Sequence, residues 1–232
     1  MRSRPALLLL LSTLAACAPL RHETPLAVAP GGPLLPSAPP VARRGLGNLQ
    51  DPRIDAWEQR LHEDGDFRRH TEESLARGTR YLPGLRRIFE ENGLPPSLAL
   101  LPVIESGFWP TARGRSGERG LWQLRRGTAR NLGLVVSAHR DDRIDPERST
   151  RAAARHLRRL RDRYGDWALA LAAYNAGERR VDRALAHEPT ATFWSLAERG
   201  YLPRTSREYV PRFLAVVRMA GEPEPTAIGS AL

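Results

Sequence analysis

Segments of helical length, separated by breaks that contain glycine or proline, run through most of the chain and constrain its fold most strongly. Asp51 is a plausible N-cap, Pro52 suits the first helical position, and apolar residues follow at helical spacing. No segment alternates apolar and polar residues as a half-buried strand does. We therefore expect one mainly α domain over residues 51–221. Further helices are predicted at Leu85–Glu91, Leu98–Glu105, Leu121–Asn131, Thr150–Tyr164, Trp167–Ala176, Arg179–Ala186 and Glu208–Met219.

The first residues have the composition of an export signal. Arg2 and Arg4 precede an apolar run, Ala6 to Ala16, which is about half as long as a membrane-spanning helix. Cys17 then stands where a bacterial lipobox has its lipidated cysteine, although ordinary signal cleavage beside it is the alternative. Ala18 favours sorting to the outer membrane. We expect a lipoprotein signal peptide at 1–16 and a lipid anchor that holds the protein at the periplasmic face of the outer membrane.

Two further segments are predicted to lie outside the folded domain. Residues 17–50 are rich in proline, alanine and glycine, which favours an extended, flexible tether. Residues 222–232 have the composition of a disordered tail.

The chain is strongly basic, with a net charge of +10 and no lysine, so arginine carries all the positive side-chain charge. Such a protein is attracted to nucleic acid, lipid headgroups or an anionic cell wall. The arginines are scattered over every segment and the leader indicates export, so no nucleic-acid partner is expected. The single cysteine excludes an intramolecular disulfide, and the six scattered histidines do not suggest a metal site.

Four short motifs follow one another between residues 105 and 177: Glu105-Ser106, Gly120 to Gln123, Arg143 to Pro146, and Ala172 to Gly177. Their order and spacing resemble the catalytic domain of lytic transglycosylase family 1, especially its membrane-bound D type. The resemblance extends over roughly Tyr81 to Met219. It implies a lysozyme-like helical fold of the goose-type lysozyme class, and an enzyme that cuts the glycan strands of peptidoglycan.

Glu105 follows an apolar segment, and burial there would raise the pKa of its carboxyl group towards neutrality. A lone glutamate at the end of a helix is more often simply a charged surface residue. The resemblance identifies this one as the single catalytic acid and base. It also implies that the residues that contact substrate or position the carboxyl group are Ser106, Gln123, Tyr174, Asn175 and Tyr209.

The implied reaction is not hydrolysis and needs no cofactor. Glu105 would protonate the oxygen that links N-acetylmuramic acid to N-acetylglucosamine, while the N-acetyl group of the substrate stabilises the anomeric centre. Glu105 would then take the proton from the muramoyl 6-hydroxyl, closing a 1,6-anhydro ring. Hydrolytic glycosidases use two carboxylates. Glu118, Asp141 and Asp142 are close in sequence, but we interpret them as solvated loop charges.

The chain departs from the family pattern in the two loops before the third motif. Leu124-Arg125-Arg126 replace Phe-Met-Pro, Gly114 replaces a serine, and Glu118-Arg119 replace small residues. One of the two arginines could pair with a muramoyl lactyl or stem-peptide carboxylate, or the change could be drift on an exposed turn. No LysM repeats are expected. A catalytically weak or silent peptidoglycan-binding lipoprotein on the same fold is therefore the alternative function, and a hydrolytic lysozyme is the nearest enzymatic one.

Overall fold

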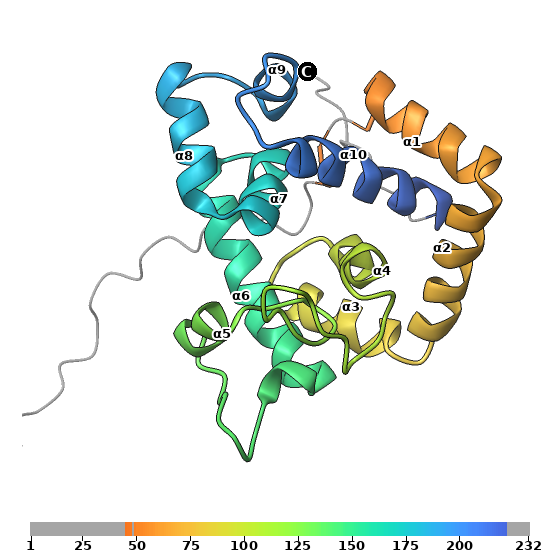
Figure 1. Ribbon diagram of the computed structural model, residues 1–232, viewed down its shortest axis with the longest axis vertical. Helices are drawn as coiled ribbons and strands as arrows, with labels where there is room; N and C mark the ends of the chain where they lie inside the picture. Colours follow the sequence, from red (N-terminus) through yellow and green to blue (C-terminus); the bar gives the residue numbers. More distant parts are fainter. Residues whose placement is uncertain (1–44, 48, 222–232) are drawn as a thin grey trace, which may run out of the picture. The chain divides into compact units, whose positions relative to one another are not determined.

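The computed structural model describes residues 45–47 and 49–221, and within this part of the chain the regular secondary structure is helical (Figure 1). Only three isolated β-bridges occur there, between Arg113 and Arg119, Arg119 and Leu124, and Val136 and Asp141. The mainly α prediction is confirmed. The elements are α1 (Pro52–Glu63), α2 (Gly65–Gly78), α3 (Leu82–Glu91), η2 (Pro96–Leu100), α4 (Leu101–Glu105), α5 (Arg126–Asn131), η3 (Asp142–Ile144), α6 (Pro146–Tyr164), α7 (Trp167–Ala176), α8 (Glu178–His187), α9 (Phe193–Glu198) and α10 (Arg204–Met219).

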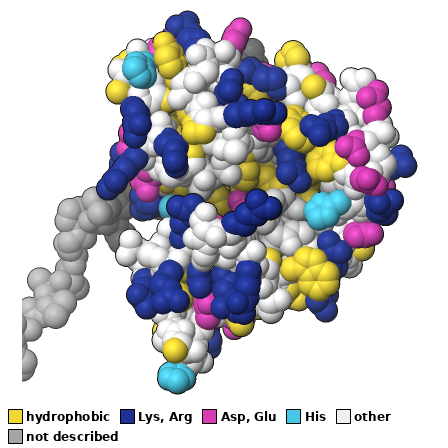
Figure 2. Space-filling view, in the orientation of Figure 1, with side chains coloured by type: hydrophobic (Ala, Val, Ile, Leu, Met, Phe, Trp, Pro, Cys, Tyr) yellow, Lys and Arg dark blue, Asp and Glu magenta, His cyan; other side chains and the backbone are white. Residues whose placement is uncertain are grey.

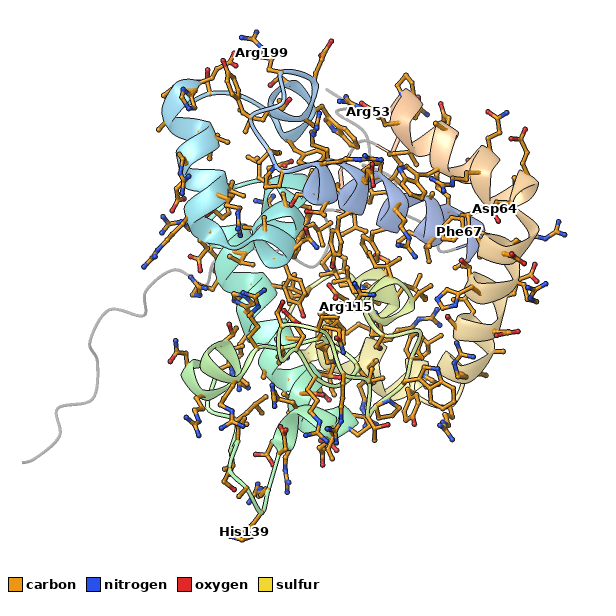
Figure 3. The ribbon with its side chains drawn as sticks, viewed as in Figure 1. Arg53, Asp64, Phe67, Arg115, His139 and Arg199 are labelled. Carbon is orange, nitrogen blue, oxygen red and sulfur yellow. The ribbon has the colours of Figure 1, made fainter. Side chains whose placement is uncertain are left out.

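Aspartate caps fix where several helices begin. The side chain of Asp51 accepts a hydrogen bond from the backbone N–H of Arg53, and Pro52 occupies the first helical position, as predicted. Asp64 ends α1 and caps α2, where it lies beside Phe67 (Figure 3). Asp166 caps α7 in the same way. Because each cap lies next to the helix that it caps, the start of these helices can be predicted from the local sequence.

Most predicted helices are present, with shifted bounds. Trp167–Ala176 is α7 as predicted, whereas α6 begins four residues earlier than expected, at Pro146. The segment Leu98–Glu105 is divided between the 3-10 helix η2 and the short helix α4. The predicted Leu121–Asn131 helix is wrong in its first half, because Gln123 has a φ of 44° and the chain turns there before α5 begins. Helices α2 and α9 were not predicted.

Helix α7 is the central element of the core. Its residues from Trp167 to Ala173 are all buried, so it is apolar on every side. It packs against α6, α8, α9 and α10, which surround it in Figure 1. Four alanines in this stretch allow its neighbours to approach closely. Near its C-terminal end, Tyr174 and Asn175 emerge from the core at the site described below.

The loop between α4 and α5 is held against the core by one indole ring. Trp122 is fully buried, and its ring packs on Phe89 with the ring centroids 5.5 Å apart. The indole Nε1 donates a hydrogen bond of 2.9 Å to the hydroxyl of Thr150 on α6. A buried donor with a partner is stable, so this contact fixes the loop to α6 and α3.

The described residues all belong to one compact unit. The predicted leader at 1–16, Cys17, all but a few residues of the predicted tether at 17–50 and the tail at 222–232 lie outside the described residues. In the described part of the chain, no helix has the length and apolar character that crossing a membrane requires.

Candidate active site

Glu105 is the last residue of α4, and its side chain is only partly accessible. The preceding residues Leu101, Pro102 and Val103 are buried, so the helix end is surrounded by apolar groups. Burial raises the pKa of the Glu105 carboxyl group to about 7, with a smaller contribution in the same direction from the charge of Glu118. A hydrogen bond from Tyr209 and the charge of Arg212 act in the opposite direction. The carboxyl group can therefore both give and accept a proton near neutral pH.

Tyr209 on α10 is the direct partner of this carboxyl group. Its hydroxyl donates a hydrogen bond of 2.6 Å to Oε1 of Glu105, and the tyrosine side chain is 8% exposed. Burial raises the pKa of the Tyr209 hydroxyl well above its usual value of 10, so it remains a donor. A short hydrogen bond from a neutral donor orients the carboxyl group and stabilises its ionised form.

Tyr174, near the end of α7, contacts the loop that carries Gly120 to Gln123. Its hydroxyl donates to the backbone oxygen of Trp122 at 2.8 Å. Its pKa is raised well above 10, first by burial and then by the nearby charge of Glu105. Tyr174 therefore connects the core helix to the loop without donating its proton to the carboxyl group.

Ser106 and Gln123 make hydrogen bonds within the same loop region. The Ser106 hydroxyl donates to the backbone oxygens of Leu121 at 2.9 Å and Pro102 at 3.3 Å. The Gln123 side-chain nitrogen donates to the oxygen of Gly120 at 2.8 Å. The donor of Ser106 is occupied, so we propose a positioning role for it, in which it fixes the Gly120 loop beside Glu105. Gln123 keeps its side-chain oxygen available to a ligand donor.

A cavity of about 840 Å³ lies beside Glu105. It brings together four of the six predicted site residues, namely Glu105, Gln123, Tyr174 and Asn175, whereas Ser106 and Tyr209 do not line it. The Asn175 side chain is exposed to the cavity, and its Oδ1 accepts a hydrogen bond of 2.8 Å from Ser206 at the start of α10. Ser106 and Tyr209 thus contact the residues of the site without lining the cavity: Tyr209 donates to Glu105, and Ser106 donates to Leu121 in the adjacent loop.

Glu118 also lines the cavity, on the same wall as Arg125. Their side chains form an ion pair of 2.8 Å, with Glu118 20% exposed and Arg125 66% exposed. A methyl group added at Gly114 would lie 2.5 Å from the Glu118 carboxylate and 2.9 Å from the side-chain oxygen of Gln123. Glu118 therefore occupies space that a side chain at position 114 would need, which explains why glycine stands there.

Asp141 and Asp142 are not solvated loop charges, as the sequence suggested, but structural ion-pair partners. Asp141 pairs with the buried Arg143 at 2.8 Å and with Arg119 at 3.3 Å. Asp142 is 5% exposed and pairs with Arg140 at 2.7 Å. Arginine hydrogen bonds lower the pKa of both carboxyl groups, so both remain ionised. Neither lines the cavity.

Arg212 and His156 are among the residues at the site that escaped the sequence analysis. Arg212, one turn after Tyr209 on α10, contributes a positive charge that lowers the pKa of Glu105. His156 on α6 lines the cavity with its ring 5.6 Å from that of Tyr174, and burial lowers its pKa to about 4. Both residues lie on helix faces that only the fold directs towards Glu105. A neutral His156 adds a polar, uncharged group to the cavity wall.

Within residues 45–47 and 49–221, no three histidine, cysteine or acidic side chains are arranged to hold a metal ion. His139, for example, lies at the tip of the loop after α5 (Figure 3).

We expect Tyr209→Phe to raise the pKa of Glu105 above its value of about 7, because the lost hydrogen bond stabilises the ionised carboxylate. The measurement is an NMR titration of the side-chain carboxyl carbons of labelled glutamate. Tyr174→Phe is the control, since the Tyr174 hydroxyl donates to Trp122 and not to Glu105. Equal shifts in the two variants would contradict the assignment.

Comparisons with known proteins identify the domain. A family model described as "Transglycosylase SLT domain" matches residues 86–196. Membrane-bound lytic murein transglycosylase D of Escherichia coli K12 is 39% identical over 132 residues, which cover 55% of this chain and 28% of that protein. Peptidoglycan transglycosylase gp16 of Escherichia phage T7 is 38% identical over 125 residues, 52% of this chain and 9% of that protein.

A solved structure shows the same fold. The structure of an inactive mutant of lytic transglycosylase Slt from Pseudomonas aeruginosa matches with a TM-score of 0.51 and 29% identity, covering 61% of this chain and 24% of that one. The predicted lysozyme-like helical fold is thereby confirmed. The chain spans less than a third of the length of each of these three proteins.

Proposed function

We propose that this chain, which belongs to lytic transglycosylase family 1, is a peptidoglycan lytic transglycosylase. The observation that carries the proposal is the carboxyl group of Glu105, whose pKa of about 7 and position beside a large cavity suit a group that first donates and then accepts a proton. The substrate is the bond between N-acetylmuramic acid and N-acetylglucosamine in a glycan strand.

In the first step, protonated Glu105 donates its proton to the glycosidic oxygen, and the bond to the anomeric carbon breaks. The N-acetyl group of the substrate stabilises the positive anomeric centre. The carboxylate left on Glu105 continues to accept the hydrogen bond from Tyr209, which stabilises its new negative charge. In the second step, this carboxylate takes the proton of the muramoyl 6-hydroxyl, whose oxygen closes the 1,6-anhydro ring.

The proposal assigns both proton transfers to one carboxyl group. Retaining and inverting glycosidases use two. Glu178 and Glu118 both line the cavity, and Glu178 pairs with Arg159 at 2.7 Å. Glu118 is the stronger candidate, because its charge acts on the pKa of Glu105. Its pKa is lowered despite partial burial, by its hydrogen bonds to Arg125 and to backbone N–H groups. Glu118 is thus engaged with Arg125, and we propose that it shapes the cavity wall and takes no part in proton transfer.

The test is mass spectrometry of purified sacculi digested with the chain from residue 18 onwards. Muropeptides with 1,6-anhydro ends are the expected product. Reducing ends in their place would indicate hydrolysis, and Glu118→Gln would then show whether this residue is the second carboxylate.

One observation favours the alternative of a catalytically weak or silent peptidoglycan-binding protein. The Arg125–Glu118 ion pair occupies the cavity wall beside Glu105, at positions where the chain departs from the family pattern. If this ion pair narrowed the cavity so much that a glycan strand could not reach Glu105, the protein would bind sacculi without cleaving them. Recovery of cleavage in the double variant Glu118→Ala/Arg125→Ala would support that alternative.

We also propose that Cys17 carries a lipid anchor that holds the enzyme in the cell envelope, at the periplasmic face of the outer membrane. The support is the sequence of the predicted signal peptide at 1–16, the predicted tether at 17–50 and the wall substrate of the proposed reaction. A lipid anchor would keep the domain at 51–221 close to the glycan. Mass spectrometry of the mature N-terminus would find either an acylated Cys17 or an unmodified residue.

A further inference from the structure

Three arginines line the cavity beside Glu105, and they differ in how their charges are balanced. Arg125 pairs with Glu118 at 2.8 Å, and Arg159 pairs with Glu178 at 2.7 Å. Arg180 donates a hydrogen bond of 2.7 Å to the backbone oxygen of Ala176. Among residues 45–47 and 49–221, no carboxylate lies within ion-pair distance of Arg180. No carboxylate among these residues therefore balances its charge.

The other groups of the cavity do not neutralise this charge. His156 is uncharged at neutral pH because burial lowers its pKa to about 4. When Glu105 carries its proton, the cavity lining has one more positive than negative charge. That is the form in which Glu105 can act as an acid. The state of the site that is ready for the first step is thus also the state that attracts an anion.

The position of Arg180 on α8 is electrostatically unfavourable for a cation. It is the third residue of α8, where the positive end of the helix dipole disfavours a cation, and Arg179 precedes it. Its exposed side chain extends from the surface of α8, where basic side chains gather on the left of Figure 2. One donor of its guanidinium group is used by the oxygen of Ala176, and no carboxylate among the described residues balances its charge, so the group suits the binding of an anion.

We propose that Arg180 binds a carboxylate group of the substrate, and so makes the enzyme prefer anionic glycan strands to neutral ones. This inference rests on the proposed function. A guanidinium group presents two parallel N–H donors that match the two oxygens of a carboxylate. Two groups of peptidoglycan offer that chemistry: the carboxylates of the peptides, and the lactyl carboxylate of muramic acid in strands from which the peptides have been removed.

The experiment measures binding by isothermal titration calorimetry, in the Glu105→Gln background so that no turnover occurs. The ligands are a neutral oligomer of N-acetylglucosamine, glycan strands with their peptides, and glycan strands stripped of peptides by an amidase. Arg180→Ala is compared with Arg179→Ala, a matched control in the same helical turn that is exposed and does not line the cavity. Arg180→Lys keeps the charge without the paired donors.

We expect Arg180→Ala to raise Kd for at least one kind of anionic strand about five- to tenfold and to leave Kd for the neutral oligomer unchanged. Arg179→Ala should change none of the three, and Arg180→Lys should recover part of the loss. A loss restricted to strands with peptides assigns the contact to a peptide carboxylate. A loss restricted to stripped strands assigns it to the lactyl group.

Equal losses for all three ligands would overturn the proposal, because Arg180 would then be a general sugar contact or a structural residue. No loss for any anionic strand would also overturn it. Failure of the proposed function is a separate result, since it would be the absence of 1,6-anhydro products from the chain that retains Glu105. A selective loss of binding without such products would keep Arg180 as a carboxylate site on a silent binder.

Discussion

Glu105→Gln is expected to lower the turnover of glycan strands about a thousandfold or more, with little effect on the fold. Glutamine has nearly the same shape, and its side-chain oxygen can still accept the hydrogen bond from Tyr209. It cannot donate a proton to the glycosidic oxygen or remove one from the 6-hydroxyl. General acid and base catalysis contributes about 10²- to 10⁴-fold to a reaction, and here both roles fall on one group. The measurement is the rate of release of 1,6-anhydro muropeptides.

The pH dependence of stability provides the control for this variant. The pKa of Glu105 is about 7 in the folded protein and near 4.5 when unfolded, so the folded state binds this proton more tightly. The free energy of unfolding of the wild type therefore falls as pH rises from about 4.5 to 7, and glutamine does not titrate. The variant should match the wild type near pH 4 and be more stable at pH 8, by about 1–3 kcal/mol after allowance for partial exposure.

The same pKa sets the expected pH profile of the wild type. Activity should decline as pH rises above about 7, because the fraction of protonated Glu105 falls.

Thermal unfolding of the wild type and of Glu105→Gln at pH 4, 6 and 8 tests the predicted difference in stability. If Glu105→Gln were less stable than the wild type at pH 8, this account would be contradicted, because it requires the buried Glu105 carboxylate to lower the stability of the wild type at that pH. Loss of activity in such a variant could not be assigned to the missing proton transfer.

Structural features that depend only on residues close together in the sequence were predictable. The start of α1 follows from Asp51 and Pro52, and the extent of α7 from a continuous apolar segment between Asp166 and Gly177. Helix α2 escaped because its three buried residues are Thr71, Ser74 and Gly78, so it has no regular apolar face. The positive φ of Gln123 also has no local signal, and a helix was therefore predicted through a turn.

The sequence named candidate residues for the site, but it could not show how they contact one another. The motif that contains Glu105 and Ser106 identified the catalytic candidate, but Tyr209 lies 104 residues away and its hydrogen bond to Glu105 depends on how α10 crosses α4. Arg212 acts on the pKa of Glu105 for the same reason. The exclusion of a side chain at position 114 by Glu118 likewise appears only when the loop has its folded shape.

The second large effect is expected from Gly120→Ala, which should destabilise the domain by about 4 kcal/mol or more. Gly120 has a φ of +82°, and a methyl group there would overlap the backbone oxygen of Arg143. Arg143 cannot move away easily, because it is 4% exposed and its guanidinium group binds Asp141 and the backbone oxygens of Gly117 and Leu124. The measurement is the midpoint of thermal or urea unfolding.

Gly133→Ala separates the two causes of this loss. Gly133 has the same φ of +82°, but a methyl group there would meet nothing within 4 Å. The strain of an alanine at positive φ amounts to about 1 kcal/mol. For a domain of this size we therefore expect the melting temperature to fall by about 3 °C in Gly133→Ala and by about 10 °C or more in Gly120→Ala. Similar shifts in the two variants would mean that the loop can move away from Arg143.

That outcome would also affect the candidate active site, because Gly120 is hydrogen-bonded to Gln123 of the cavity wall. The oxygen of Gly120 accepts the hydrogen bond from Gln123, and the next residue, Leu121, accepts the one from Ser106 beside Glu105. A loop that moved to accommodate a methyl group would displace both contacts. We therefore expect any folded Gly120→Ala protein to lose binding of the neutral N-acetylglucosamine oligomer, and Gly133→Ala to retain it. The close approach of Gly120 to Arg143 thus couples the stability of the loop to the shape of the cavity.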